Sequence, residues 1–268
     1  MKHGRSLSHV VVLLLAVAVP AQAQDPKPAP PTAPATVAPA LAASAFQAAK
    51  LVLAKLEDLD PRGERLALAS LDAARVAPSG ERGEFVRIHV DLTLAGPDPQ
   101  SARAALAEWI EALKKEKAVV GARPIEAGAI APRLRVEVEW DPSKAPARAA
   151  AVAGASTEWD STSYIWVAAA ADKVEVGYVR TSCTKRRIPG TDWVEECWTI
   201  ASKDPARTLP RLAIHNFATV LESRHPYASV TRYAMLAASG SGTEKRMELE
   251  LTLLRPARAE EPGTGGKR

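Results

Sequence analysis

Two segments of the chain alternate apolar and polar residues so regularly that they predict half-buried strands. In EFVRIHVDLTLAG, which begins at Glu84, valine, isoleucine and leucine occupy every second position and polar residues occupy most of the others. The segment RLRVEVEW, residues 133–140, alternates in the same way. Such alternation places one set of side chains in a core and the other on a solvated sheet face. His89 is therefore expected on the surface of a sheet.

Three other segments carry apolar residues every three or four positions, which predicts helices. The first runs from Leu41 to Leu59, and the second opens after GPDPQ and ends near Lys117. The third is TLPRLAIHNFATVLES, where Thr208 is expected to cap the helix and Pro210 to lie in its first turn.

The order of elements occurs twice along the chain. A strand in WVEECWTIASKDP precedes the third helix, and two strands, ASVTRYAML and KRMELELTLL, follow it. Each half also begins with a candidate strand, ERLALASLD in the first and KVEVGYVRTSC in the second. Superposing the Asp-Pro pairs at 98–99 and 204–205 sets Leu94 against Ile200. The pattern predicts an α+β protein with two strand-strand-helix-strand-strand units.

The N-terminus has the pattern of a secretory signal peptide. A basic start, an apolar run from Val10 to Val19, and the sequence AQA before Gln24 predict cleavage near Ala23. The alternative is that this segment stays uncleaved as a membrane anchor. We predict a signal peptide at 1–23, a Pro/Ala-rich linker at 24–40, an N-terminal helix and first unit at 41–142, a linker at 143–157, a second unit at 158–256 and a disordered tail at 257–268.

Charge gives little support for a nucleic-acid partner. The formal net charge is +4, and it falls to +2 without residues 1–23, which hold two basic residues and no acidic ones. Basic and acidic residues are mixed along the chain, so the high pI marks no binding surface. We expect a periplasmic or secreted protein.

Cys183 and Cys197 are the only cysteines in the sequence, and export would place them under oxidising conditions. Their spacing fits neither a CxxC redox motif nor a four-ligand zinc site. We predict a disulfide across a hairpin whose centre is Gly190. That register would set Lys185 opposite Glu195 and Arg187 opposite Trp193.

Motifs of known catalytic sites are missing from the sequence. It has no G-x-S-x-G, no phosphate-binding loop, no G-x-G-x-x-G and no H-E-x-x-H. Glu137 and Glu139 are expected on one solvated strand face, while Glu195 and Glu196 are expected on opposite faces. We therefore predict no catalytic residue, no metal site and no cofactor. An enzyme with an unrecognised site remains a third hypothesis.

Two groups of residues are candidates for contact with a partner. Aromatic residues gather in EWDSTSYIWV, where alternation would put two of them on one sheet face; they either fill a core or form a binding platform. A run of three cations lies beside an indole in the predicted hairpin and is either a solvated turn or a contact surface. The candidates are Trp159, Tyr164, Trp166, Lys185, Arg186, Arg187 and Trp193.

The passage FVRIHVDLTLAGPDPQSARAALAEWIEAL resembles the strand-glycine-helix passage of the inner-membrane assembly-platform proteins of type IV pili and type II secretion systems. RLRVEVEW resembles their closing strand, and the likeness covers about residues 41–141 and, more faintly, 174–254. This resemblance implies ferredoxin-like units and a non-catalytic scaffold that pairs through sheet edges and helices. It differs in the N-terminus, because that family has a cytoplasmic tail and a true membrane helix. The family has no site motif, so the resemblance implies no functional residue.

The main hypothesis is an exported, non-enzymatic interaction protein of the bacterial envelope, a component of pilus or secretion assembly. It would bind protein partners or form a homo-oligomer, and it would associate with a membrane only if the N-terminal segment were retained. The alternative is a glycan- or ligand-binding envelope protein that uses the aromatic-rich second unit.

Overall fold

The computed structural model describes residues 41–80, 83–95, 98–125, 133–146, 163–177, 179–202, 204, 206, 208–225, 227–237 and 244–257. All of them belong to one unit of the chain, Thr36–Arg268. The predicted signal peptide, the Pro-rich linker and the tail beyond residue 257 lie outside the described residues. Among the helices described, none is both long and apolar enough to cross a membrane.

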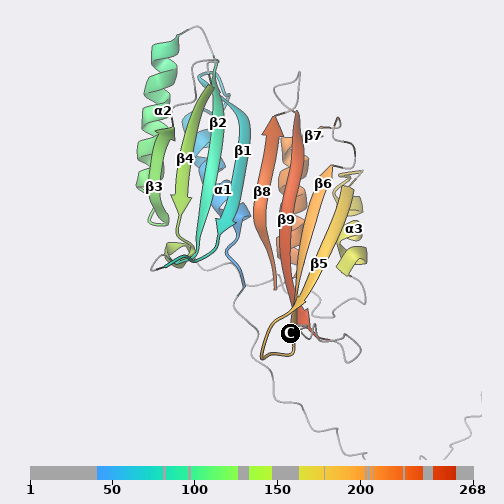
Figure 1. The fold of residues 1–268 in the computed structure, drawn as a ribbon. Coiled ribbons are helices and arrows are strands. Elements are labelled where there is room, and N and C mark those ends of the chain that lie inside the picture. The colour runs from blue at the N-terminus through green and yellow to red at the C-terminus, as the bar shows by residue number, and fades with distance from the viewer. Residues whose placement is uncertain are drawn as a thin grey trace, which may run out of the picture. The chain divides into compact units, whose positions relative to one another are not determined.

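The described elements form two repeats with the same order, helix-strand-strand-helix-strand-strand (Figure 1). The first repeat consists of α1 (Ala45–Leu59), β1 (Leu66–Val76), β2 (Phe85–Leu94), α2 (Pro99–Lys114), β3 (Val119–Ile125) and β4 (Arg133–Trp140). The second consists of α3 (Ser163–Lys173), β5 (Val179–Arg187), β6 (Trp193–Ser202), α4 (Arg211–Arg224), β8 (Ala228–Ala237) and β9 (Glu244–Pro256). A 3₁₀ turn, η1 (Pro142–Lys144), follows β4, and the short strand β7 (Leu209–Pro210) precedes α4. The predicted α+β class is confirmed.

The strands form one antiparallel nine-stranded sheet in the order β3-β4-β2-β1-β8-β9-β6-β5, with β7 beside β9. Each repeat contributes its strands in the order third, fourth, second, first. The fourth strand therefore lies between the second and the third in both repeats. Pairing between β1 and β8 joins the repeats, so the first repeat's first strand meets the second repeat's third strand.

A shared irregularity relates the two repeats residue by residue. The pairing of β3 with β4 slips between Val119 and Gly121, and that of β8 with β9 slips between Val230 and Arg232. When these slips are superposed, Val138 of β4 falls on Leu249 of β9. Val138 faces Ile88 of β2 and Leu249 faces Ile200 of β6, so Ile88 corresponds to Ile200. The superposition of the Asp-Pro pairs, which set Leu94 against Ile200, was wrong because Asp98 is the N-cap of α2, whereas the N-cap of α4 is Pro210 and not Asp204.

The same correspondence extends to the first strands. Ala73 of β1 lies opposite Ile88, and Thr181 of β5 lies opposite Ile200. Thr181 therefore occupies the place of Ala73. The two repeats match in strand order, in the position of a slip and in register, which supports the internal repetition inferred from the sequence.

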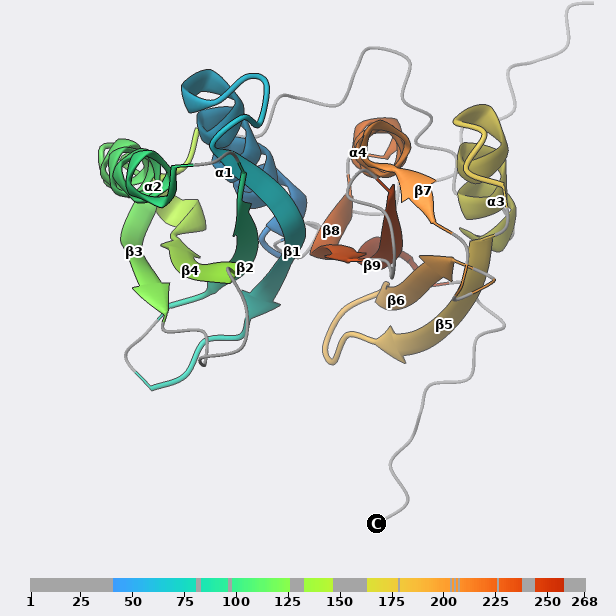
Figure 2. The same cartoon turned by 90° about the horizontal axis from the view of Figure 1, so that it is seen from above.

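The helices cover one face of the sheet and leave the other face open (Figure 2). The alternating residues Val86, Ile88, Val90 and Leu92 of β2 are fully buried beneath α1 and α2, as predicted. Apolar residues of both repeats are also buried, among them Leu106, Ile110, Val90 and Val136 in the first repeat and Phe217, Leu249 and Leu251 in the second. They form one continuous apolar cluster across both repeats rather than two separate cores.

Helix α1 joins the repeats on the covered face. Its Phe46 ring lies 5.0 Å from the ring of Tyr233 on β8 and 5.0 Å from that of His215 on α4. Ser44, which caps α1, donates its hydroxyl hydrogen to Glu222 of α4. The same carboxylate oxygen accepts the backbone N–H of Val230 at 2.9 Å. One buried glutamate therefore connects the start of α1 with α4 and β8.

Two local predictions were wrong, and one strand was not assigned. Tyr164 and Trp166 belong to helix α3 and not to a strand, because their alternation covers few residues and a run of alanines, the best helix formers, follows. Pro210, without a side-chain hydrogen bond, caps α4, so Thr208 does not. The predicted unit required a strand between the second helix and RLRVEVEW, but the sequence analysis did not assign its residues, because the glycine and proline of β3 suit only an edge strand.

Candidate functional site

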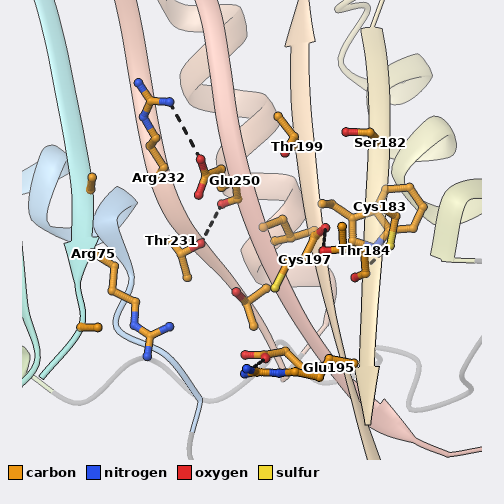
Figure 3. Close-up of a pocket in the computed structure, with 16 residues that line it drawn as sticks. Arg75, Ser182, Cys183, Thr184, Glu195, Cys197, Thr199, Thr231, Arg232 and Glu250 are labelled. Atoms are coloured by element: carbon orange, nitrogen blue, oxygen red, sulfur yellow. Dashed lines mark hydrogen bonds and ion pairs between the residues drawn. The ribbon is translucent and has the colours of Figure 1, made fainter. Parts of the chain in front are cut away.

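The open face of the second repeat contains a hollow of about 620 Å³ (Figure 3). Its lining residues, apart from Ala77 just after β1, come from strands β1, β5, β6, β8 and β9, so it extends across the junction between the repeats. The hollow exists because short side chains occupy the open face there. They are Ala74, Ser182, Thr184, Cys197, Thr199 and Thr252.

Charged residues at the hollow are already paired with one another. The Arg232 guanidinium donates two hydrogen bonds to the Asp72 carboxylate, at 3.1 and 3.0 Å, across the β1–β8 junction. It also lies 3.4 Å from Glu248 and 3.9 Å from Glu250. The hydrogen bond with Asp72 raises the pKa of Arg232 above its ordinary value. Arg232 of β8 therefore forms ion pairs with β1 and β9 and is not free to bind a substrate anion.

The predicted disulfide between Cys183 and Cys197 is wrong, because both cysteines are free. Cys183 lies opposite Trp198 and Cys197 lies opposite Thr184, one residue away from the predicted register. A shift of one residue reverses the face of every side chain on a strand. Cys183 consequently packs against the core, whereas Cys197 is exposed on the open face, although both border the hollow.

The turn of the hairpin explains this shift. Ile188 and Trp193 close a four-residue loop through the Ile188 N–H, which donates to the Trp193 carbonyl at 2.9 Å. Within it, Pro189 and Gly190 form the centre of a type II turn, with φ of +72° at Gly190. An N–H···O bond of 3.2 Å from Thr191 to Ile188 closes this turn. The hairpin is thus centred after Gly190 rather than on it.

The three hairpin cations pair with acids in the observed register. Lys185 lies 3.3 Å from Glu196, Arg186 bonds Glu195, and Arg187 lies 3.1 Å from Asp192. The predicted facing pairs, Lys185 with Glu195 and Arg187 with Trp193, were wrong because the register differs by one residue from the predicted one. The cations themselves are exposed, so they remain available to a partner.

A buried ionic group on the covered side of the hairpin escaped the sequence analysis. Glu196 is fully buried, and its carboxylate accepts hydrogen bonds from Arg255 at 2.7 Å and from the Trp198 indole at 3.1 Å. Glu195 points to the open face, so the expected division of these two glutamates is confirmed. The signal that could have revealed Glu196 is an acid at a core-facing position of an alternating strand.

The aromatic candidates do not form an exposed platform in the described part of the chain. Trp193 is buried, and its ring lies 5.3 Å from that of Tyr227. Tyr164 and Trp166 belong to α3, and Trp159 lies outside the described residues. Of the partner-contact candidates whose side chains are described, only Lys185, Arg186 and Arg187 are exposed.

Neither thiol is poised for nucleophilic chemistry. Burial raises the pKa of Cys183 to about 11 and also raises that of Cys197. Because the thiolate is the reactive form, both groups should react more slowly at neutral pH than an ordinary cysteine. On the first repeat's open face, a hydrogen bond from Arg123 lowers the pKa of Glu137 and keeps it ionised. Within the described ranges, no three His, Cys, Asp or Glu residues gather as metal ligands would.

Comparisons with known proteins give no family for this chain. No protein-family model matches the sequence, and no curated protein sequence matches it significantly. One solved structure with some likeness is the acyl-CoA thioesterase II TesB2 from Mycobacterium marinum, which is 10% identical. The match covers 81% of this chain and 91% of the thioesterase, with a TM-score of 0.20. A superposition this poor carries no argument about fold or activity.

Proposed function

We propose that the chain is an exported, non-enzymatic interaction protein of the bacterial envelope, built from two ferredoxin-like units. The assembly that it serves would be of the pilus or secretion kind, which the resemblance of its sequence to assembly-platform proteins suggests. The mature protein would begin near Gln24 and would act by holding protein partners together.

The ferredoxin-like assignment rests on the order of elements. A ferredoxin-like unit runs β-α-β-β-α-β. Moving its first strand to the end of the unit gives α-β-β-α-β-β, the order found in both repeats. The fold also contains a split β-α-β motif, in which another strand separates two parallel strands. In the first repeat, β4 separates β2 from β3 in this way, and β9 separates β6 from β8 in the second.

The observation that carries the proposal is the edge pairing of two like units. Strand β1 pairs with β8 from Leu71 to Ala74, and Arg232 reinforces this short ladder through Asp72. Addition of one strand to the edge of another sheet is a common mode of protein recognition. A unit that already pairs with the other repeat of the same chain through a sheet edge is suited to pairing with other chains.

The open face supports a structural role more than a catalytic one. Its charged residues neutralise one another, as Arg135 does with Asp91 at 2.6 Å and Arg123 with Glu137 at 2.7 Å. A general acid or base would need a pKa near the working pH. These carboxylates are held by cations, and Cys197 in the hollow stays protonated. The burial of Trp193 likewise gives the glycan-binding alternative no support.

The proposal can be tested in the native host with the full chain tagged at its C-terminus. After fractionation, intact-mass measurement should find an N-terminus near Gln24. Native gel electrophoresis of gently solubilised envelopes should find the protein in a complex larger than one chain. Arg103→Asp changes an exposed residue of α2. It serves as a control variant and should leave the complex intact.

Recovery of chains that keep Met1 in the cytosol would contradict export. An exported protein that migrates only as a monomer, with or without chemical cross-linking, would contradict the interaction role.

A further inference from the structure

Strand β5 forms one end of the nine-stranded sheet. It pairs with β6 on one side, and no other described strand pairs with its second edge. Its counterpart in the first repeat, β1, has partners on both sides, β2 and β8. An edge strand without a partner presents backbone N–H and C=O groups that can pair with another chain. The β1–β8 junction therefore shows what a strand added to β5 would look like.

Strands β1 and β5 carry opposite charges at one equivalent position. Thr181 occupies the place of Ala73, so the preceding residue, Arg180, occupies the place of Asp72. At the junction, Arg232 of the added strand binds Asp72 through two hydrogen bonds. Arg180 is exposed and forms no ion pair with another described residue. A strand that joined β5 would need a carboxylate where β8 has Arg232.

A second copy of this chain is a poor occupant. Its free edges among the described strands are β5 itself and β3, the counterpart of β8. Pairing of two β5 strands would bring like charges together, because β5 carries Arg180, Lys185, Arg186 and Arg187 and no acidic residue. In the junction geometry, Arg123 of β3 would lie opposite Arg180, and like charges that face each other destabilise a strand pair. Pro124 would replace Met235 and has no N–H to donate. Among the described strands, neither free edge of a second copy therefore matches β5.

We propose that β5 accepts an extended acidic strand from a different protein, added antiparallel to its free edge. The inference rests on the proposed role as an interaction protein and names the chemistry of one partner. The added strand alternates acidic and apolar residues. A carboxylate opposite Ser182 would contact Arg180 as Arg232 contacts Asp72. Apolar residues would lie on the other face, beside Cys183, which packs against the core.

The test uses the mature chain, residues 24–268, and an acetylated peptide of four Val-Glu pairs. NMR titration should shift the β5 amide signals, and hydrogen exchange should slow at these amides when the peptide is bound. Arg180→Asp should weaken binding about fivefold to tenfold, because an attractive cross-strand pair becomes repulsive. A peptide of Val-Lys pairs should show the reverse preference and favour the Arg180→Asp variant. Arg103→Asp makes the same change in net charge on α2 and should leave both affinities unchanged.

Three results would overturn the inference: no binding of the Val-Glu peptide, equal binding to the Arg180→Asp variant, or self-association of the chain that protects β5, either alone or together with β3. The last would identify a second copy as the occupant. If the peptide fails to bind while the envelope complex persists, only the docking edge is rejected. If the complex is also absent, the proposed function falls with it.

Discussion

Cys183 and Cys197 lie on opposite faces of one hairpin, since the β5–β6 register sets Cys183 beside Trp198 and Cys197 beside Thr184. A disulfide between them would require a shift of the whole strand by one residue. That shift would also expose core-facing residues of β5 and β6. The protein should therefore keep two free thiols even under oxidising conditions.

Intact-mass measurement after alkylation in denaturant, without reductant, should count two modified cysteines. In the folded protein at neutral pH, alkylation should be slow, because burial raises the pKa of both thiols. An unfolded thiol loses its proton near pH 9.0, while Cys183 keeps its proton up to about pH 11. Raising the pH between these values should favour the unfolded chain, and Cys183→Ser should reduce this loss of stability. An unmodified, oxidised pair would contradict the observed register.

Glu222 offers a second test at the scale of single residues. Its carboxylate accepts hydrogen bonds from the Ser44 hydroxyl and the Val230 N–H in a buried environment. Glu222→Ala should lower the free energy of unfolding by about 3 kcal/mol, because two buried donors lose their acceptor. Glu222→Gln keeps an oxygen there and should cost about 1 kcal/mol. Urea denaturation measures both; equal losses would show that the hydrogen bonds do not matter.

The sequence allowed side-chain faces to be predicted where alternation was long. The apolar set of β2 is buried and its polar set lies on the open face, as expected from 84–96 alone. The faces of the two cysteines could not be predicted, because they depend on whether a loop holds an odd or even number of residues. The sequence IPGTD does not indicate how many residues the loop holds. The buried pair of Glu196 and Arg255 was likewise hidden, since β6 and β9 are distant in sequence.

At the scale of elements, the β5–β6 hairpin depends on its turn. Gly190 has φ of +72°, a conformation in which an added Cβ is unfavourable. A Cβ at this position would meet no atom within 4 Å, so any cost is conformational. Gly190→Ala should therefore lower the free energy of unfolding by about 1 kcal/mol.

Gly83 provides the matched control for this change. It also has open space around its Cα, but its φ is not in the left-handed region. Gly83→Ala should be neutral or slightly stabilising, because it reduces the freedom of the unfolded chain. Thermal or urea unfolding of the two variants compares them directly. Equal stability of both would contradict the type II turn at Pro189 and Gly190.

Helices and strands with strong periodicity were predictable, and short elements were not. α2 and β4 match their sequence patterns, and α2 is capped by Asp98, which lies within the predicted break GPDPQ. The interpretation of α3 failed because two aromatic residues at a spacing of two imitate a strand over a few residues. Strand β3 failed because its conformation is imposed by β4 beside it, in spite of Gly121 and Pro124.

At the scale of the whole molecule, the repeat was visible in the order of elements, but the way in which the repeats join was not. Strands β1 and β8 are far apart in sequence, and neither carries a pattern that identifies its partner. Their pairing leaves one mismatched pair of edges, at β3 and β5. The ion pair of Arg232 with Asp72 and the packing of Phe46 on Tyr233 then fix the junction from both faces.

The account depends most on this edge pairing, and one engineered cross-link tests it. Asp72 faces Ala234 across the junction. Facing residues in an antiparallel pair have Cα atoms about 4.5–5.5 Å apart, which suits a disulfide. The measurement is the intact mass of Asp72→Cys/Ala234→Cys, with Cys183 and Cys197 replaced by serine, after mild oxidation. Asp72→Cys/Leu236→Cys is the control, because its diagonal spacing of about 7–8 Å is too wide.

We expect nearly complete formation of an internal disulfide in the first variant, seen as the loss of two hydrogens, and little in the second. Two free thiols in both variants, or cross-links between chains in place of the internal one, would contradict the joining of two like units through their sheet edges.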